Sequence, residues 1–578
     1  MKKLCLTALL TLLLMMTTAG CIDKNYDLSN IDTTAQFTVV DLVVPVNIDA
    51  ILLENILKTS KDFTVIDGVY AYVKDGTFSS DPIRISDFNV HIGDISPAYA
   101  VMESGGVPVP GVDVSYEASD ISMTDVDFRS QGIDGNVCAV TLVRADIALS
   151  LHLDFSSLKG AASRCETRNL TLQLPSGLVL AEPSAQGSYD AAKGLFRLNN
   201  TLCETASGLD LRLRFSAMQI PAAAFDYSSH TIHISRELGI SSGGILLPAK
   251  YQTAGATLPS DISVRLDCDV ADFNVANIDG KIRYVIRNMD VPRIEMTGLP
   301  DFLAQEGTDL RLKNPCLYIA TNNPLDPYGV FVETGFEITA YRGTTPSGPY
   351  RIDGETFIVG GREQQPVEGR YSFVLSPEAP QRVVEGYPKP LHVGYKALSD
   401  VLAGDGIPSA LQPRLVNPLA PEQAVSEFRL GENFGSVEGS YRIIADLQLN
   451  AGSAIVYNGK VNDLWSEDMD RLTITAMDVA LSVSTDIPAT LTLSAVALDK
   501  DGKAIPGVRL TADKIEANTE AQPVTVTAEL PEGGFCGLGG LSFYVTSASV
   551  DGAPLAPDMQ IKLADIRPRV SGYFIKKL

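Results

Sequence analysis

The sequence has little of the material from which histidine-based and metal-based active sites are built. Five histidines and one tryptophan occur in 578 residues, and no HExxH or P-loop pattern is present. His230 and His233 are three residues apart, a spacing that places them on opposite faces of a strand and disfavours a shared metal. The sequence therefore offers no candidate catalytic residue, metal site or cofactor site, and it leaves open whether the protein is an enzyme.

Positive charge is also scarce. Lysine and arginine number 46 against 70 aspartates and glutamates, which gives a net charge of −24. Such an acidic chain repels phosphate backbones and anionic lipid headgroups. We therefore expect no nucleic-acid partner and no electrostatic docking on a membrane.

Only one long apolar run is present, and it lies at the N-terminus. Lys2 and Lys3 precede an apolar stretch over 4–16, and Ala19-Gly20 precede Cys21. This order is typical of a secretory signal, and it resembles the lipobox of bacterial lipoproteins. The resemblance implies that residues 1–20 are a signal peptide and that Cys21 carries acyl chains, palmitate among them, that hold the protein in the outer membrane. No second run approaches the roughly 20 residues that a spanning helix needs.

Six cysteines remain after Cys5 and Cys21, and none of them forms a CxxC pair. An exported chain can oxidise its thiols. Cys165 and Cys203 lie in polar surroundings, so they are the candidate disulfide pair, although connectivity stays open. Cys268 alternates with Leu266 and Val270, a pattern that predicts a buried thiol in a strand.

Alternation of apolar and polar residues recurs along the chain, for example over 147–155, 209–215 and 491–495. A period of two with one apolar face predicts antiparallel strands. Asp-Gly and Asn-Gly pairs punctuate these stretches and favour tight turns, one of them at 75–76 within a predicted hairpin over 69–78. We predict an all-β protein of antiparallel, immunoglobulin-like β-sandwich modules in series, with short helices at 49–58 and 396–402.

Composition divides the predicted chain further. A polar stretch without periodicity follows the signal, and prolines gather over 408–421, which favours a linker there. The predicted order is a signal peptide (1–20), a lipidated tether (21–34), an N-terminal β module (35–120), a second sandwich (121–270), a third sandwich ending in the Pro-rich linker (271–425) and a C-terminal sandwich (426–578).

Two stretches carry a resemblance beyond the lipobox. Residues 21–34 resemble the start of a group of Bacteroidetes surface lipoproteins of unassigned function. Trp465, the Asp-Ile-Pro at 486–488 and the stretch 497–502 are similar to the same group. The resemblance implies serial β-sandwich modules on the cell envelope and implies no activity. Whether the protein faces the surface or the periplasm stays open.

Three polar or glycine-rich stretches have competing interpretations. The glycine run over 533–540 precedes a predicted strand rather than a helix, so a strand connection is favoured over a phosphate loop. The Asp-Lys-Asp-Gly at 499–502 lacks the later ligands of a calcium loop and predicts a hairpin turn. A loop with Trp465, Glu467, Asp468 and Asp470 is a candidate partner contact or, alternatively, a solvated loop.

These observations favour a lipid-anchored envelope protein that acts by binding or adhesion to a protein or a glycan. Two alternatives remain. One is an envelope hydrolase acting on glycans, whose carboxylates leave no local signature. The other is a fimbria-like assembly component that donates the strand-like segment 570–575, although that segment is also suited to completing its own last sheet.

Overall fold

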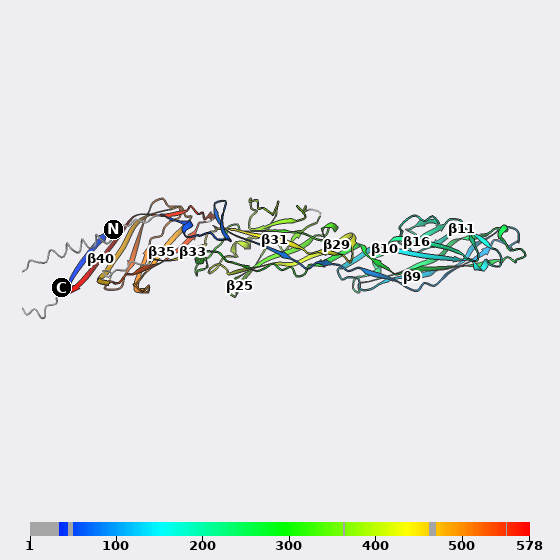
Figure 1. The fold of residues 1–578 in the computed structure, drawn as a ribbon, viewed down its shortest axis with the longest axis horizontal. Coiled ribbons are helices and arrows are strands. Elements are labelled where there is room, and N and C mark those ends of the chain that lie inside the picture. The colour runs from blue at the N-terminus through cyan, green and yellow to red at the C-terminus, as the bar shows by residue number, and fades with distance from the viewer. Residues whose placement is uncertain (1–33, 44–49, 362–363, 462–469, 551, 578) are drawn as a thin grey trace, which may run out of the picture. The chain divides into compact units, whose positions relative to one another are not determined.

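The computed structural model describes residues 34–43, 50–361, 364–461, 470–550 and 552–577. They divide into two compact units. Unit 1 joins the segment up to residue 58 to residues 305–307 and to everything from 451 onward. Unit 2 holds residues 59–304 and 308–450. Figure 1 shows both units built from strands, and no helix in the described residues is long and apolar enough to cross a membrane.

Within its described residues, unit 1 contains the short 3-10 turn η2 (Leu53–Asn55) and ten strands. The strands are β1 (Thr34–Val43), β2 (Ile51–Leu52), β33 (Ala454–Val461), β34 (Leu472–Thr485), β35 (Ala489–Leu498), β36 (Ala504–Ala512), β37 (Gln522–Glu529), β38 (Gly540–Ser549), β39 (Ala553–Pro554) and β40 (Gln560–Lys577).

The main sheet of unit 1 brings together the two ends of the described chain. Its order is β1-β40-β34-β37-β36-β35-β38-β33, with β2 also paired to β40. The N-terminal β1 runs antiparallel to the C-terminal β40, with Phe37 opposite Phe574. The segment 570–575 thus lies inside β40, which has β1 on one edge and β34 on the other. In this structure the C-terminal segment completes the sheet of its own chain.

Unit 2 contains the remaining strands. They are β3 (Phe63–Ile66), β4 (Val69–Ser79), β5 (Ile83–Arg84), β6 (Phe88–Ile92), β7 (Ala98–Ser104), β8 (Val114–Ser122), β9 (Thr124–Ser130), β10 (Val137–Asp154), β11 (Arg164–Gln173), β12 (Leu178–Leu180), β13 (Gly187–Asp190), β14 (Leu195–Leu198), β15 (Leu202–Glu204), β16 (Leu209–Gln219), β17 (Phe225–Asp226), β18 (Thr231–Leu247), β19 (Asp261–Val270), β20 (Phe273–Val275), β21 (Asn277–Val285), β22 (Ile294–Glu295), β23 (Cys316–Thr321), β24 (Val332–Arg342), β25 (Thr345–Arg351), β26 (Phe357–Val359), β27 (Tyr371–Ser376), β28 (Leu391–Gly394), β29 (Ala410–Arg429), β30 (Asn433–Gly435), β31 (Glu438–Asp446) and β32 (Gln448–Leu449).

The short 3-10 turns of unit 2 are η3 (Ser156–Leu158), η4 (Ala222–Ala224), η5 (Ala249–Tyr251), η6 (Asp301–Ala304), η7 (Asp326–Tyr328) and η8 (Lys396–Asp400). The strands form a 21-stranded assembly, a six-stranded sheet in the order β28-β27-β23-β31-β4-β3, and the small β30-β5 pair. Among the described strands only β27 and β28 pair in parallel. The prediction of an antiparallel, all-β architecture is confirmed.

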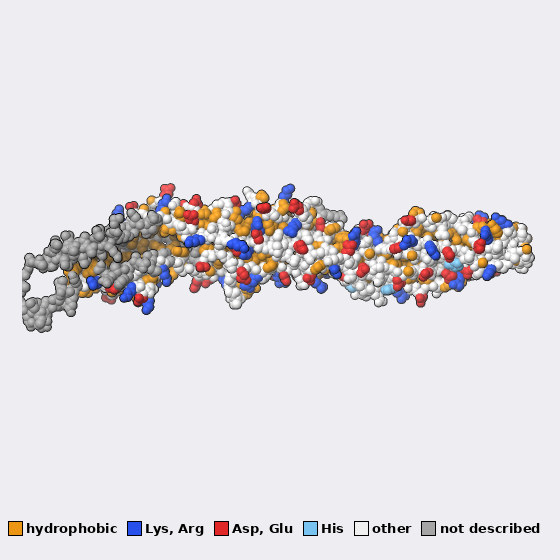
Figure 2. Space-filling model, viewed as in Figure 1, with side chains coloured by type: hydrophobic (Ala, Val, Ile, Leu, Met, Phe, Trp, Pro, Cys, Tyr) orange, Lys and Arg blue, Asp and Glu red, His pale blue; other side chains and the backbone are white. Residues whose placement is uncertain are grey.

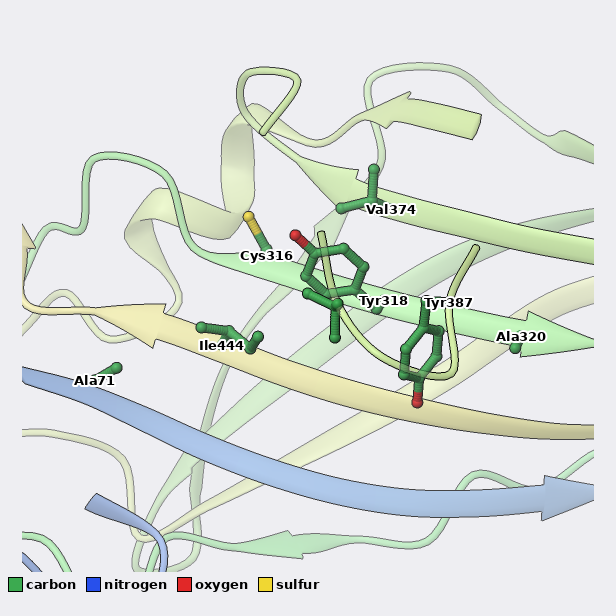
Figure 3. Close-up of a cluster of buried hydrophobic side chains, with 8 residues drawn as sticks. Ala71, Cys316, Tyr318, Ala320, Val374, Tyr387 and Ile444 are labelled. Carbon is green, nitrogen blue, oxygen red and sulfur yellow. The ribbon is translucent and has the colours of Figure 1, made fainter. Parts of the chain in front are cut away.

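One face of the six-stranded sheet shows how apolar side chains hold unit 2 together. Tyr318 of β23 and Tyr387 of the covering loop lie near each other with ring centroids 5.7 Å apart, as Figure 3 shows. Cys316, Val374 and Ile444 extend the same cluster. Burial raises the pKa of the Cys316 thiol to about 11. Each large side chain buried in this way stabilises the fold by about 1.5–3 kcal/mol.

The two predicted helices are short 3-10 turns, not α-helices. Residues 51–55 form β2 and the 3-10 turn η2, and residues 396–400 form the 3-10 turn η8. Both stretches are short. In isolated helices of fewer than about 12 residues, the free energy gained by propagation is too small to offset the cost of nucleation. Packing against neighbouring strands then decides the local conformation.

The predicted linker over 408–421 is also wrong, because these residues enter β29, the longest strand of unit 2. Two of its three prolines are accommodated by irregular pairing, whereas Pro413 pairs in register with Ile338. The register shifts between Val416 and Leu419, which brackets Pro418, and between Ala420 and Gln423, which brackets Pro421. A bulge leaves one residue outside the hydrogen-bond ladder, so a missing N–H costs little there.

The predicted hairpin over 69–78 is replaced by one continuous strand, β4. Asp75 lies opposite Arg442 and Gly76 lies opposite Tyr441. A Cβ atom at Gly76 would lie 2.2 Å from the Tyr441 ring, so this glycine makes room for a cross-strand aromatic ring. The true turn is Asp67-Gly68, where both residues have positive φ, 50° and 82°.

The grouping of strands differs from the order of consecutive modules that the sequence predicted. Unit 1 takes strands from both ends of the chain, and unit 2 lies between them in sequence. The β1–β40 pairing joins residues more than 500 positions apart, for example Thr34 and Lys577. Pairing over such a separation leaves no local pattern, so a division based on composition places these strands in different modules.

Candidate functional site

One polar face of unit 2 is built on three strands, β16, β10 and β19, with β10 between the other two. In β16, Leu211, Leu213 and Phe215 are buried, while the intervening side chains are exposed. β10 lies beside β16 and carries His152 opposite Asp210. On its other edge β10 pairs with β19, where Asp267 lies opposite His152. The period-two pattern thus places apolar side chains on the buried face of these strands and a row of polar side chains on the exposed face.

His152 lies between two carboxylates on this face. Its Nδ1 is 2.8 Å from an Oδ1 of Asp210, whose side chain is 77% exposed. Asp267 accepts hydrogen bonds of 2.6 and 2.9 Å from Arg265. Gly208, at the turn before β16, has φ of 67°, and a Cβ there would lie 2.2 Å from the Leu153 carbonyl oxygen. A glycine is therefore required for the chain to approach β10 so closely.

Two surface hollows open along β16. The first, of about 260 Å³, is lined by Ser150, Leu151, His152, Asp210, Leu211, Arg212, Asp267, Cys268 and Asp269. The second, of about 680 Å³, is lined by Asp146, Leu180, Ala181, Glu182, Pro183, Ser184, Ala185, Gln186, Arg212, Leu213 and Arg214. Arg212 lines both hollows, and we call them together the β16 groove.

Arg212 differs from its neighbours in having no partner. Arg214 is held by Asp146, with 2.6 Å between Nη2 and Oδ2. Arg212 is exposed, and within the described part of the chain it forms no ion pair and no hydrogen bond through its side chain. In a protein of net charge −24 this guanidinium is available to an anion.

The segment 180–186 forms the wall of the second hollow. It is fixed to β16 by a backbone hydrogen bond of 2.9 Å from Ala181 N to the Arg214 carbonyl oxygen. Gln186 donates from Nε2 to the Asp210 carbonyl oxygen at 3.1 Å. The wall thus combines polar side chains, those of Glu182, Ser184 and Gln186, with small or apolar residues between them.

The β16 groove does not assemble a nucleophile with a base. Ser150 lies two residues from His152 on the same strand, which separates their Cα atoms by about 7 Å, and no hydrogen bond joins the two described side chains. Residues 239–243 read Gly-Ile-Ser-Ser-Gly, the spacing of a hydrolase nucleophile elbow, but they lie within β18. Such an elbow requires a strand-to-helix turn.

The structure separates the site residues predicted from the sequence. Cys21, Trp465, Glu467 and Asp468 lie outside the described residues. Asp470 is exposed, and its carboxylate lies close to Gly537. His233 is exposed on β18 and His230 precedes that strand. Among the described residues no group of three or more metal-ligating side chains occurs.

Two further predictions from the sequence have clear outcomes. Asp499 Oδ1 accepts hydrogen bonds from the backbone N–H of Asp501 and Lys503, both at 2.9 Å, so 499–502 is the predicted turn between β35 and β36. The glycine run over 533–540 leads into β38, as predicted. Cys268 is only half-buried rather than buried as predicted, and this partial burial raises the pKa of its thiol to about 12.

Cys165 and Cys203 lie directly opposite each other. Cys165 is in β11 and Cys203 is in β15, and they are register partners in the antiparallel pair. Both side chains are buried. Burial, with a contribution from Cys203, raises the pKa of Cys165 to about 12, and burial raises that of Cys203 to about 11.

Comparison with known proteins adds little beyond the fold class. No protein-family model and no curated protein matches the sequence. A solved protein from Parabacteroides distasonis that carries the description of a secreted protein aligns with 51% of this chain and 89% of its own, at 10% identity and a TM-score of 0.34. A Broad Bean Stain Virus structure (9% identity, 52% of this chain, 89% of that chain) and recombinant peptide:N-glycanase F (13%, 52%, 99%) give TM-scores of 0.13 and 0.12. Similarities this weak carry no information about function.

The β16 groove was not predicted from the sequence. Alternation along β16 and β10 indicates that Asp210, Arg212 and His152 point outward. It does not indicate that β10 lies between β16 and β19, because strand neighbours are set by long-range pairing. The unpartnered state of Arg212 depends on those neighbours and has no local signal.

Proposed function

We propose that the protein is a lipid-anchored envelope protein that binds a carboxylate-bearing glycan through the β16 groove and acts by contact rather than by catalysis. The observation that carries this proposal is the exposed, unpartnered guanidinium of Arg212, which lines both hollows. The anchor is the acylated Cys21, and nucleic acid is not a partner of so acidic a chain.

A carboxylate suits Arg212 because a guanidinium presents parallel N–H donors that match the two oxygens of a carboxylate. Two other arginines of unit 2 already have such partners, since Arg214 pairs with Asp146 and Arg164 pairs with Glu204. An external carboxylate would complete the same kind of pair at Arg212. The pair would be solvated, so it contributes specificity and modest affinity.

A glycan fits the lining better than a protein partner does. The groove lacks aromatic side chains and offers hydroxyl, imidazole and amide groups from Ser150, His152 and Gln186. Five carboxylates also line it, so a bound carboxylate must be held at Arg212 and kept away from them; they are Asp146, Glu182, Asp210, Asp267 and Asp269. Protein interfaces usually place aromatic or aliphatic anchors at their centre. The larger hollow also falls within the range of about 300–1,000 Å³ typical of small-ligand sites.

One observation favours a hydrolase as the second candidate. Asp210 and Asp267 lie opposite His152 on the two strands that flank β10, so two strand spacings separate their Cα atoms, though not their carboxyl groups, by about 9.6 Å. Inverting glycosidases hold their carboxyl groups about 6.5–9.5 Å apart. Against this role, the Asp210 side chain is 77% exposed, whereas a general acid is usually kept protonated by burial.

The test uses the soluble chain of residues 22–578 and two polymers, polygalacturonate as the carboxylate-bearing probe and amylose as the neutral one. We expect saturable binding of polygalacturonate, weakened by salt, and loss of about ten-fold in affinity for Arg212→Ala. Arg509→Ala alters an exposed arginine of unit 1 and serves as the control. Equal affinity of the Arg212→Ala variant and the unmodified chain would exclude the β16 groove as the binding site.

A further inference from the structure

We infer that Cys165 and Cys203 form a disulfide bond in the exported protein, and that this bond closes the segment carrying the wall of the β16 groove. The inference rests on the export that the proposed function requires, because thiols stay reduced in the cytosol.

The backbone geometry supports this bond. Cys165 and Cys203 are direct register partners between β11 and β15, flanked by the pairs Arg164–Glu204 and Glu166–Leu202. Opposed residues of antiparallel strands have Cα atoms about 4.5–5.5 Å apart, within the range of about 4.4–6.8 Å that disulfides span. No backbone movement is needed to join them.

In the structure both thiols are free, so forming the bond requires the side chains to turn toward each other. The Cys203 Sγ lies 3.4 Å from the Thr201 carbonyl oxygen, to which it donates as a thiol. Rotation of this thiol toward β11 exchanges a weak hydrogen bond for a covalent one. Both cysteines have relative exposures below 5%, so the bond would be shielded from external thiols.

The reaction joins two thiols. Two S–H bonds break and one S–S bond forms, with release of two protons and two electrons. A disulfide-carrying oxidoreductase of the envelope accepts the electrons as its own disulfide is reduced to a dithiol. Only a thiolate attacks a disulfide, and burial raises the pKa of both thiols, so the bond forms during folding, before these cysteines are buried.

The bond would constrain a particular part of the groove. Residues 166–202 lie between the two cysteines and include β12, β13 and β14 as well as the wall segment 180–186. The wall hydrogen-bonds to β16 through Ala181 and Gln186. A bond between Cys165 and Cys203 reduces the number of conformations that the unfolded segment can adopt. The wall therefore loses less conformational entropy when it folds.

The test is peptide mapping of the full chain, produced with its own signal and isolated from the envelope fraction. Free thiols are alkylated before unfolding and again after it, and trypsin then releases residues 165–168 and 198–212, each with one of the two cysteines. We expect these two peptides as one cross-linked species, lighter by two hydrogens than their sum. Cys268 and Cys316 serve as internal controls and should be alkylated.

A second sample separates the two ways in which the inference can fail. The soluble chain of residues 22–578 is unfolded, reduced and refolded in a buffer of reduced and oxidised glutathione. The link in both samples supports the inference. A link in the glutathione sample alone would overturn the export on which the inference rests. If Cys165 and Cys203 are alkylated in both samples, their opposed positions do not lead to a disulfide, and the inference is wrong.

Discussion

At the residue scale, polar side chains of this protein mostly satisfy one another across neighbouring strands or within turns. Asp226 is an example at the turn between β17 and β18. Its carboxylate accepts hydrogen bonds of 2.7 Å from the hydroxyls of Ser229 and Ser228 and of 2.9 Å from the Ser228 N–H. These bonds, that of Ser229 first, lower the pKa of Asp226 from 3.8 to about 2.

This pKa shift predicts how stability depends on pH. The folded state holds the charged form of Asp226 more strongly than the unfolded state does, so the stabilisation is present above about pH 4 and is lost as the pH falls toward 2. We expect Asp226→Asn to lower the urea midpoint of unfolding at about pH 6, and we expect the difference from the unmodified chain to shrink between pH 4 and 2. A difference that does not change with pH would contradict the assignment.

Single residues also show where reasoning from sequence succeeds and fails. Asp-Gly at 67–68 is the turn that its composition predicts, whereas the same pair at 75–76 lies within β4. The pairs are locally alike, and the Tyr441 ring over Gly76 distinguishes them. A contact with a residue more than 360 positions away decides the conformation, so no local pattern could reveal it.

At the element scale, strand alternation was the most informative pattern. It predicted the buried and exposed faces of β10 and β16 and the antiparallel, all-β class. It did not predict β29, because the prolines at 413, 418 and 421 indicated a linker and the bulges that accommodate two of them have no local signature. It also did not predict which strands are neighbours, and therefore it could not predict the β16 groove.

The inferred disulfide between Cys165 and Cys203 gives a prediction about stability. Removing a bond that closes the loop between Cys165 and Cys203 restores conformational freedom to the unfolded chain. We expect the oxidised protein to exceed the Cys165→Ala/Cys203→Ala variant by about 2–4 kcal/mol in the free energy of unfolding of unit 2, measured by urea denaturation. Cys268→Ala, which alters a cysteine outside this loop, is the matched control. Equal stability of the oxidised protein and the double variant would contradict the prediction.

Strand β40 gives a second prediction at this scale. It pairs with β1 on one edge and β34 on the other, so its removal leaves two strands of unit 1 with unsatisfied backbone groups. We expect a chain ending at residue 559 to lose the protease resistance of unit 1, with mass spectrometry of limited digests locating the cuts. A chain lacking only Leu578 is the control. Retained resistance without β40 would contradict its role as an interior strand.

At the scale of the whole molecule, β1 begins at Thr34, where the predicted tether ends. We expect Cys21→Ser to move the protein from the membrane fraction to the soluble fraction, because several buried acyl chains bind a bilayer firmly and the acidic chain has little other affinity for it. Fractionation followed by immunoblotting measures this. A variant that stays in the outer membrane would contradict the anchor.

The net charge of −24 also bears on what the whole molecule can bind. Figure 2 shows acidic and basic side chains interspersed over the visible face of unit 2. The net charge repels an anionic polymer at long range, so recognition must come from short-range contacts such as the one proposed at Arg212. Binding of a carboxylate-bearing glycan would thus be slow to associate and specific to its site, rather than a general effect of charge.

One titration tests the contact proposal most directly. Polygalacturonate is added to the soluble chain of residues 22–578, and binding and polymer length are followed in the same samples. We predict saturable binding that weakens about ten-fold in Arg212→Ala and not in Arg509→Ala, with the polymer length unchanged. Shortening of the polymer that stops in Asp210→Asn or Asp267→Asn would show catalysis and contradict the proposal, as would the absence of binding.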